Sequence, residues 1–165
     1  MTAASACART TGLALKAIPS PAAASMSRSL APSPMATVCA IVSGGFTAFT
    51  DGLRRDLDLD YAHANQLEVV DGRVTGEVLG PVVDRPGKAR LLAEIAAAEG
   101  VPLSQTVAVG DGANDLDMLA AAGLGIAFNA KPVVRAQADT TVSVPHLDAI
   151  LFLLGIRGHD VDPVD

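Results

Sequence analysis

An aspartate flanked by two glycines ends an apolar run in the segment VAVGDGANDLDML, residues 107–119. The apolar residues predict a strand, Asp111 follows it in the loop, and a helix is expected to open on Asn114 and Asp115. Carboxylates at the C-terminal end of a strand suit a hard, oxygen-seeking cation such as Mg2+. The helix N-terminus adds backbone N–H donors for an anion. The segment therefore predicts a site for a metal–phosphate pair, with an Asx-capped turn as the simpler structural alternative.

Two other segments carry groups that bind phosphate. In CAIVSGGF, residues 39–46, Ser43 can donate to a phosphate oxygen, and Gly44 and Gly45 allow backbone amides to approach it closely. Lys88 lies in the first turn of a predicted helix, where the helix dipole opposes a cation. This placement indicates a role in binding, with a solvated surface lysine as the alternative. In chain order the three segments supply a serine–glycine phosphate cradle, a lysine and a metal aspartate.

Strand and helix patterns alternate from residue 37 onward and predict how these segments are positioned. Strands are expected at 37–43, 66–70, 73–79, 105–110, 124–128 and 140–144. Helices are expected at 46–57, 86–99, 114–122, 132–137 and 146–154. Asp71-Gly72 is a hairpin turn signal between two of the strands. The alternation predicts an α/β fold with ligands at the strand C-termini, where all three segments fall.

The three segments resemble the second, third and fourth motifs of haloacid-dehalogenase-type phosphohydrolases, and within them the phosphoserine phosphatase branch. The matching residues are VSGGF at 42–46, GKA at 87–89 and GDGANDL at 110–116. The similarity extends over about residues 38–157. It implies a three-layer Rossmann-like parallel sheet. It also implies Mg2+-dependent hydrolysis of O-phospho-L-serine to L-serine and phosphate, a step of serine biosynthesis.

The resemblance also implies roles for individual residues. An aspartate nucleophile would form an aspartyl-phosphate, and a neighbouring aspartate would protonate the leaving serine hydroxyl. Asp115 would support either the metal or the lysine. The implied assignments are Lys88 as a catalytic residue, Ser43, Gly44 and Asn114 for substrate or phosphate, and Asp111 and Asp115 for Mg2+.

The first motif of that family, an apolar strand ending in Asp-x-Asp-x-Thr/Ser that carries the nucleophile, is not found in this sequence. No aspartate or glutamate precedes Asp51, and Asp56-x-Asp58 follows a polar helical stretch rather than a buried strand. We therefore expect a sheet without its central first strand, no cap, and a chain that is inactive alone. The alternative is a non-catalytic phosphate- or Mg2+-binding remnant, or the product of a mis-predicted gene.

Residues 1–37 are rich in Ala, Ser and Pro and contain no acidic residue. This composition is typical of a transit peptide. It also arises when a GC-rich stretch is read in the wrong frame or when a start is assigned inside a gene. We favour this second explanation. We expect disorder over 1–37, a phosphatase core over 38–157 and a flexible acidic tail over 158–165. The alternative is that the first segment supplies a substitute for the missing strand. Its best apolar stretch is residues 11–18, although these are Ala-rich and more helical than strand-like by propensity.

Composition indicates which classes of partner and which cellular compartment to expect. The net charge of −6 argues against nucleic acid as a partner. Two cysteines form no disulfide framework, which suits the cytoplasm, with organelle targeting by residues 1–37 as the weaker alternative. No apolar run reaches 18 residues, so no membrane span is expected.

Overall fold

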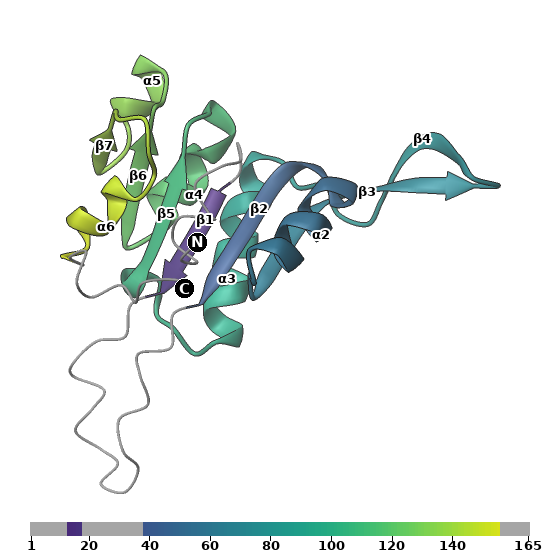
Figure 1. Ribbon diagram of the computed structural model, residues 1–165, viewed down its shortest axis with the longest axis horizontal. Helices are drawn as coiled ribbons and strands as arrows, with labels where there is room; N and C mark the ends of the chain where they lie inside the picture. The colour runs from purple at the N-terminus through teal and green to yellow at the C-terminus, as the bar shows by residue number, and fades with distance from the viewer. Residues whose placement is uncertain (1–12, 18–37, 156–165) are drawn as a thin grey trace, which may run out of the picture.

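The computed structural model describes residues 13–17 and 38–155, which form one seven-stranded sheet with helices packed against it (Figure 1). The strands are β1 (Leu13–Ala17), β2 (Cys39–Phe46), β3 (Tyr61–Val70), β4 (Arg73–Leu79), β5 (Thr106–Gly110), β6 (Leu124–Phe128) and β7 (Thr140–Val142). The α-helices are α2 (Thr47–Asp56), α3 (Arg85–Ala98), α4 (Leu116–Ala121), α5 (Pro132–Arg135) and α6 (Ala149–Leu153). Two short 3-10 helices, η2 (Leu103–Gln105) and η3 (Ala113–Asp115), precede β5 and α4. The predicted α/β class is confirmed.

The sheet order is β4-β3-β2-β1-β5-β6-β7. β2 pairs with β3 in parallel, and β5, β6 and β7 also pair in parallel. Because β2 and β5 both run antiparallel to the strand between them, they run parallel to each other. Their carboxyl ends therefore lie at the same edge of the sheet, as expected for the two motif-bearing strands.

The centre of the sheet differs from the expectation. The place between β2 and β5, predicted to lack the family's first strand, is filled by β1, which runs antiparallel to both neighbours. The stretch considered as a substitute strand, residues 11–18, forms one at Leu13–Ala17, and its helical preference is wrong over this range. β2 and β5 both present backbone N–H and C=O groups toward the gap, and pairing these groups outweighs a weak local propensity. The remaining residues of the expected 1–37 and 158–165 segments lie outside the described ranges.

Apolar side chains pack on both faces of the sheet, which gives the predicted three layers. One cluster joins Ala40, Val42 and Ala108 of the strands to α3 and α4, whose buried members include Leu92 and Leu119. A second cluster on the opposite face joins Val107, Val109 and Ile126 to Ile150 of α6. Alternate residues of β5 thus enter different clusters, as the two-residue period of a strand requires.

Most predicted elements are present with shifted ends. β3 begins at Tyr61, five residues before the expected start, and projects with β4 from the body as a hairpin (Figure 1). Asp71 and Gly72 form its turn with φ of 50° and 76°, the positive values of a type I′ turn. No helix in the described part of the chain has both the length and the apolar character needed to cross a membrane.

Candidate functional site

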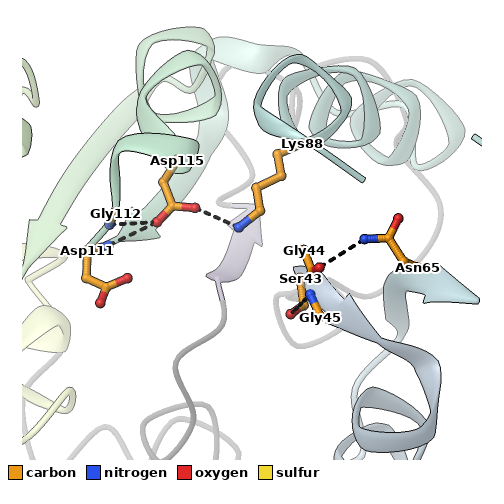
Figure 2. Close-up of polar contacts among 8 residues, drawn as sticks. All are labelled: Ser43, Gly44, Gly45, Asn65, Lys88, Asp111, Gly112 and Asp115. Carbon is orange, nitrogen blue, oxygen red and sulfur yellow. Dashed lines mark hydrogen bonds and ion pairs between the residues drawn. The ribbon is translucent and has the colours of Figure 1, made fainter. Parts of the chain in front are cut away.

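The three segments singled out in the sequence meet at the carboxyl edge of the sheet. Ser43 and Gly44 lie in the last part of β2, and Asp111 follows β5. Gly44 lies close to the third segment, since a Cβ atom built on it would be 4.0 Å from Asn114 Nδ2. The structure therefore brings together residues 43–45 of β2, called the Ser43 turn, and residues 111–112, called the Asp111 loop. Lys88 enters from α3 between them (Figure 2).

A buried ion pair joins the second and third segments. Lys88 Nζ donates to Asp115 Oδ1 at 2.7 Å, and the two residues are only 4% and 2% exposed. α3 presents the lysine in its first turn because Asp84 caps the helix, its carboxylate accepting a hydrogen bond from Gly87 N at 2.9 Å. A buried cation held by one carboxylate keeps N–H donors for a further anion. Lys88 is thus not a solvated surface lysine, and its role in binding stays a prediction.

Asp115 also shapes the loop that carries Asp111. Its Oδ2 atom accepts hydrogen bonds from the backbone N–H groups of Asp111 and Gly112, at 3.1 and 3.0 Å. Gly110 permits this close approach, because a Cβ atom there would lie 2.5 Å from Asp115 Cβ. The Asp111 side chain is exposed and points away from Asp115 (Figure 2). Asp115 therefore links Lys88 to the backbone of the loop. The Asp111 carboxylate takes no part in these hydrogen bonds.

The Ser43 turn has the form of a small anion cradle. Gly45 N donates to Ser43 Oγ at 3.0 Å, so the hydroxyl acts as an acceptor within its own turn and retains its proton for donation. Gly44 and Gly45 are both exposed, and neither carries a side chain over its backbone N–H. The turn can therefore offer a hydroxyl and backbone amides to an oxyanion.

One polar residue of the site was missed in the sequence. Asn65 lies on β3, is 7% exposed, and donates from Nδ2 to Gly44 O at 2.9 Å (Figure 2). Its Oδ1 accepts from Val83 N at 2.7 Å. The predicted strand starts at residue 66, so Asn65 lies just outside it, whereas β3 begins at Tyr61. An asparagine inside an apolar strand pattern was the available signal.

The described residues supply few of the ligands that Mg2+ needs. The ion prefers six oxygen ligands in octahedral geometry. Asp111 offers one free carboxylate, whereas both oxygens of Asp115 already accept hydrogen bonds from Lys88 and the loop. Over residues 38–155, no three His, Cys, Asp or Glu side chains gather as a metal would require. The described residues do not complete a Mg2+ site, and assigning Asp111 and Asp115 as ligands stays a prediction.

The Asp56-x-Asp58 sequence lies away from this edge of the sheet. α2 ends at Asp56, and the chain then returns to the beginning of β2, where Asp60 Oδ2 accepts from Cys39 N at 2.7 Å. Ser43 lies near the other end of β2, where the three segments meet. Neither Asp56 nor Asp58 is therefore placed to attack a phosphate held by Ser43 and Lys88, in agreement with the sequence analysis.

Comparison with known proteins places the chain in a family. A model of the haloacid dehalogenase-like hydrolase family matches residues 2–120, most of the chain. The chain belongs to this family. The family match begins upstream of the Ser43 turn and ends within α4, so it includes all three segments of the site.

Its relatives in the haloacid dehalogenase-like family include phosphoserine phosphatases. The enzyme of Streptomyces coelicolor is 67% identical over 125 residues, which are 76% of this chain and 30% of that protein. Phosphoserine phosphatase SerB2 of Mycobacterium tuberculosis is 58% identical over 127 residues, 77% of this chain and 31% of that protein. The chain thus spans about a third of the length of these relatives.

The fold of this family member also matches a solved structure. The crystal structure of a probable phosphoserine phosphatase from Vibrio cholerae superposes with a TM-score of 0.68 at 52% identity. The superposition covers 70% of this chain and 36% of the Vibrio chain. Most of the Vibrio chain therefore lies outside the superposition.

Proposed function

We propose that this chain carries the phosphate-binding part of a phosphoserine phosphatase, which hydrolyses O-phospho-L-serine to L-serine and phosphate in serine biosynthesis. The observation that carries the proposal is the buried Lys88–Asp115 ion pair, which joins the lysine to the Asp111 loop beside the Ser43 turn. The relatives at 67% and 58% identity support the choice of substrate.

Each residue has a task in binding the phosphate group. Lys88 acts as the catalytic cation that offsets the charge of the phosphoryl oxygens. The Ser43 hydroxyl and the Gly44 backbone N–H hold two of those oxygens, and the Asn114 amide contacts the substrate. Phosphoryl transfer depends mostly on positioning the phosphate and on neutralising its charge. These groups would therefore supply a large part of what the reaction requires.

Mg2+ is the proposed cofactor, with Asp111 as the ligand that this chain offers. When bound, the ion supplies positive charge against the phosphoryl oxygens. Asp115 contributes by holding Lys88 and the Asp111 loop, and any direct contact of Asp115 with the ion competes with these hydrogen bonds. We propose a cytoplasmic location on the basis of the cysteine content.

The second candidate is a non-catalytic phosphate-binding protein. It is favoured by the direction of β1, which runs antiparallel to β2 and β5 and contains no acidic residue in Leu13–Ala17. The end of β1 that reaches the site is its amino end, so a nucleophile cannot be presented there by the carboxyl end of this strand. We accordingly expect the chain alone to be inactive.

A chimaera tests the proposed substrate. Residues 1–37 are replaced by the part of the Streptomyces relative that precedes its matched region, and phosphate release is measured with Mg2+. We expect faster hydrolysis of L-phosphoserine than of phosphoglycolate or sugar phosphates. A folded chimaera that prefers one of the other phosphomonoesters would refute phosphoserine as the substrate.

A further inference from the structure

We infer that Asn65 is a positioning residue that fixes the Ser43 turn against the start of α3, and so places the phosphate cradle relative to Lys88. The inference rests on the proposed function, because it concerns the same site. Asn65 acts through the backbone of two other segments: one contact is to Gly44 and the other is to Val83.

The two contacts require an amide side chain. Nδ2 donates to a carbonyl oxygen and Oδ1 accepts from a backbone N–H, so one side chain needs a donor and an acceptor at fixed positions. An aspartate would retain the acceptor and lose the donor, and an alanine would lose both. Asn65 is 7% exposed, so water has little access to replace either bond.

A continuous series of contacts leads from Val83 to the lysine. Val83 precedes Asp84, whose carboxylate caps α3 through Gly87 N and whose carbonyl accepts from Lys88 N at 2.9 Å. A displacement of Val83 therefore moves the first turn of α3, and Lys88 with it. Asn65 is the side chain that connects this turn to the cradle.

The packing of the two backbone segments supports the same conclusion. A Cβ atom built on Gly44 would lie 3.4 Å from Val83 O, so the Ser43 turn and the approach to α3 are nearly in contact. Asn65 bonds to both of these segments, at Gly44 O and at Val83 N. The spacing between cradle and lysine then depends on one amide.

The first measurement is a titration of the full chain with inorganic phosphate, followed through the amide NMR signals of Ser43, Gly44 and Gly45. We expect Asn65→Ala to weaken phosphate binding about tenfold, the effect of losing hydrogen bonds that orient the site. Thr106→Val is the matched control, because Thr106 is also buried and makes two hydrogen bonds, to Leu103 O and from Gly123 N. Its phosphate affinity should not change.

The second measurement is amide hydrogen exchange in the absence of phosphate. Asn65→Ala should speed exchange at Val83, Gly87 and Lys88, whereas Asn65→Asp should keep Val83 protected because its acceptor remains. If Asn65 had a merely structural role, Asn65→Ala would instead speed exchange throughout β2 and β5. A Thr106→Val substitution that destabilises the protein equally would have the same general effect. Unchanged exchange at Val83 in Asn65→Ala would overturn the inference.

The two measurements separate the inference from the proposed function. If the unaltered chain shows no saturable phosphate binding at the Ser43 turn, the proposed function is contradicted and the exchange data still decide the role of Asn65. If the chain binds phosphate and Asn65→Ala binds it equally well, the positioning role is wrong while the proposed function stands.

Discussion

Lys88 and Asp115 illustrate how single residues determine the chemistry of this site. Both are nearly inaccessible to solvent, and each is the charged partner of the other. Two charges removed from water lose much hydration energy. The protein tolerates this loss because the Lys88–Asp115 contact is short and because Asp115 Oδ2 accepts two further hydrogen bonds. A protein that needed only a stable core would fill this position with apolar side chains. The pair therefore places a buried ammonium group at the carboxyl edge of the sheet.

Removing the charge of Asp115 should destabilise the protein strongly. Asp115→Asn leaves Lys88 buried without a charged partner, and we expect the free energy of unfolding to fall by about 3 kcal/mol. Asp117→Asn is the matched control, because Asp117 pairs with Arg85 at the surface and its loss should cost less than about 1 kcal/mol. Urea denaturation of both variants measures the difference. Equal losses of unfolding free energy in the two variants would show that the buried pair contributes no more to stability than the surface pair.

At the scale of elements, β3 and α3 are joined at both ends of the sheet. Asn65 connects β3 to the approach to α3 near the site, and at the opposite edge Tyr61 Oη donates to Glu99 Oε1 just after α3 ends. The hydrogen bond to Glu99 raises the pKa of Tyr61 above its ordinary value of 10.0, with desolvation and the charges of Glu99 and Asp60 acting in the same direction. The phenol is thus favoured over the phenolate in the folded state.

The Tyr61 contact predicts a shift in alkaline titration. The stabilisation from this contact is fully present below the unfolded pKa of about 10 and is lost as pH rises through the higher folded value. Tyr61 is the only tyrosine and the chain has no tryptophan, so phenolate absorbance reports this group alone. We expect a midpoint above 10.0 that falls in Glu99→Ala. Glu94→Ala, which removes an exposed acid within α3, should leave the midpoint unchanged. The same midpoint in all three proteins would contradict the contact.

At the scale of the whole molecule, the sheet depends on β1. This five-residue strand is the only connection between the β4-β3-β2 half and the β5-β6-β7 half of the described sheet. Ser43 belongs to the first half and Asp111 follows the second, so the distance across the site depends on β1. The strand pairs from Leu13 with Val42 to Ala17 with Thr106, which sets the register of both halves.

A proline in β1 should separate the two halves. Leu15 pairs with Ala40 on one side and Ala108 on the other, and Leu15→Pro removes its backbone N–H. We expect a loss of about 2 kcal/mol or more in the free energy of unfolding, since a buried carbonyl is left unpaired. Leu15→Val keeps the N–H and should retain the sheet. Proline and valine variants of equal stability would mean that β1 does not bridge the halves.

Sequence patterns predicted the parts of this molecule that depend on local chemistry. The hairpin turn at Asp71, the helix that presents Lys88 and the loop of Asp111 follow from short-range signals. β1 could not be predicted in the same way, because its strand conformation comes from partners distant in the sequence. Asn65 was missed for a similar reason, since its two contacts lie 21 and 18 residues away. The engagement of both Asp115 oxygens likewise depends on tertiary placement.

The most direct test of the account is phosphate release from L-phosphoserine by the purified chain with Mg2+ present, compared with Lys88→Ala. The described residues offer a lysine, a serine–glycine turn and one free carboxylate, which bind substrate and transition state alike and give little acceleration. We predict that the two proteins release phosphate at the same background rate. Activity of the unaltered chain that disappears in Lys88→Ala would contradict the account, because it would mean that this chain contains a nucleophile.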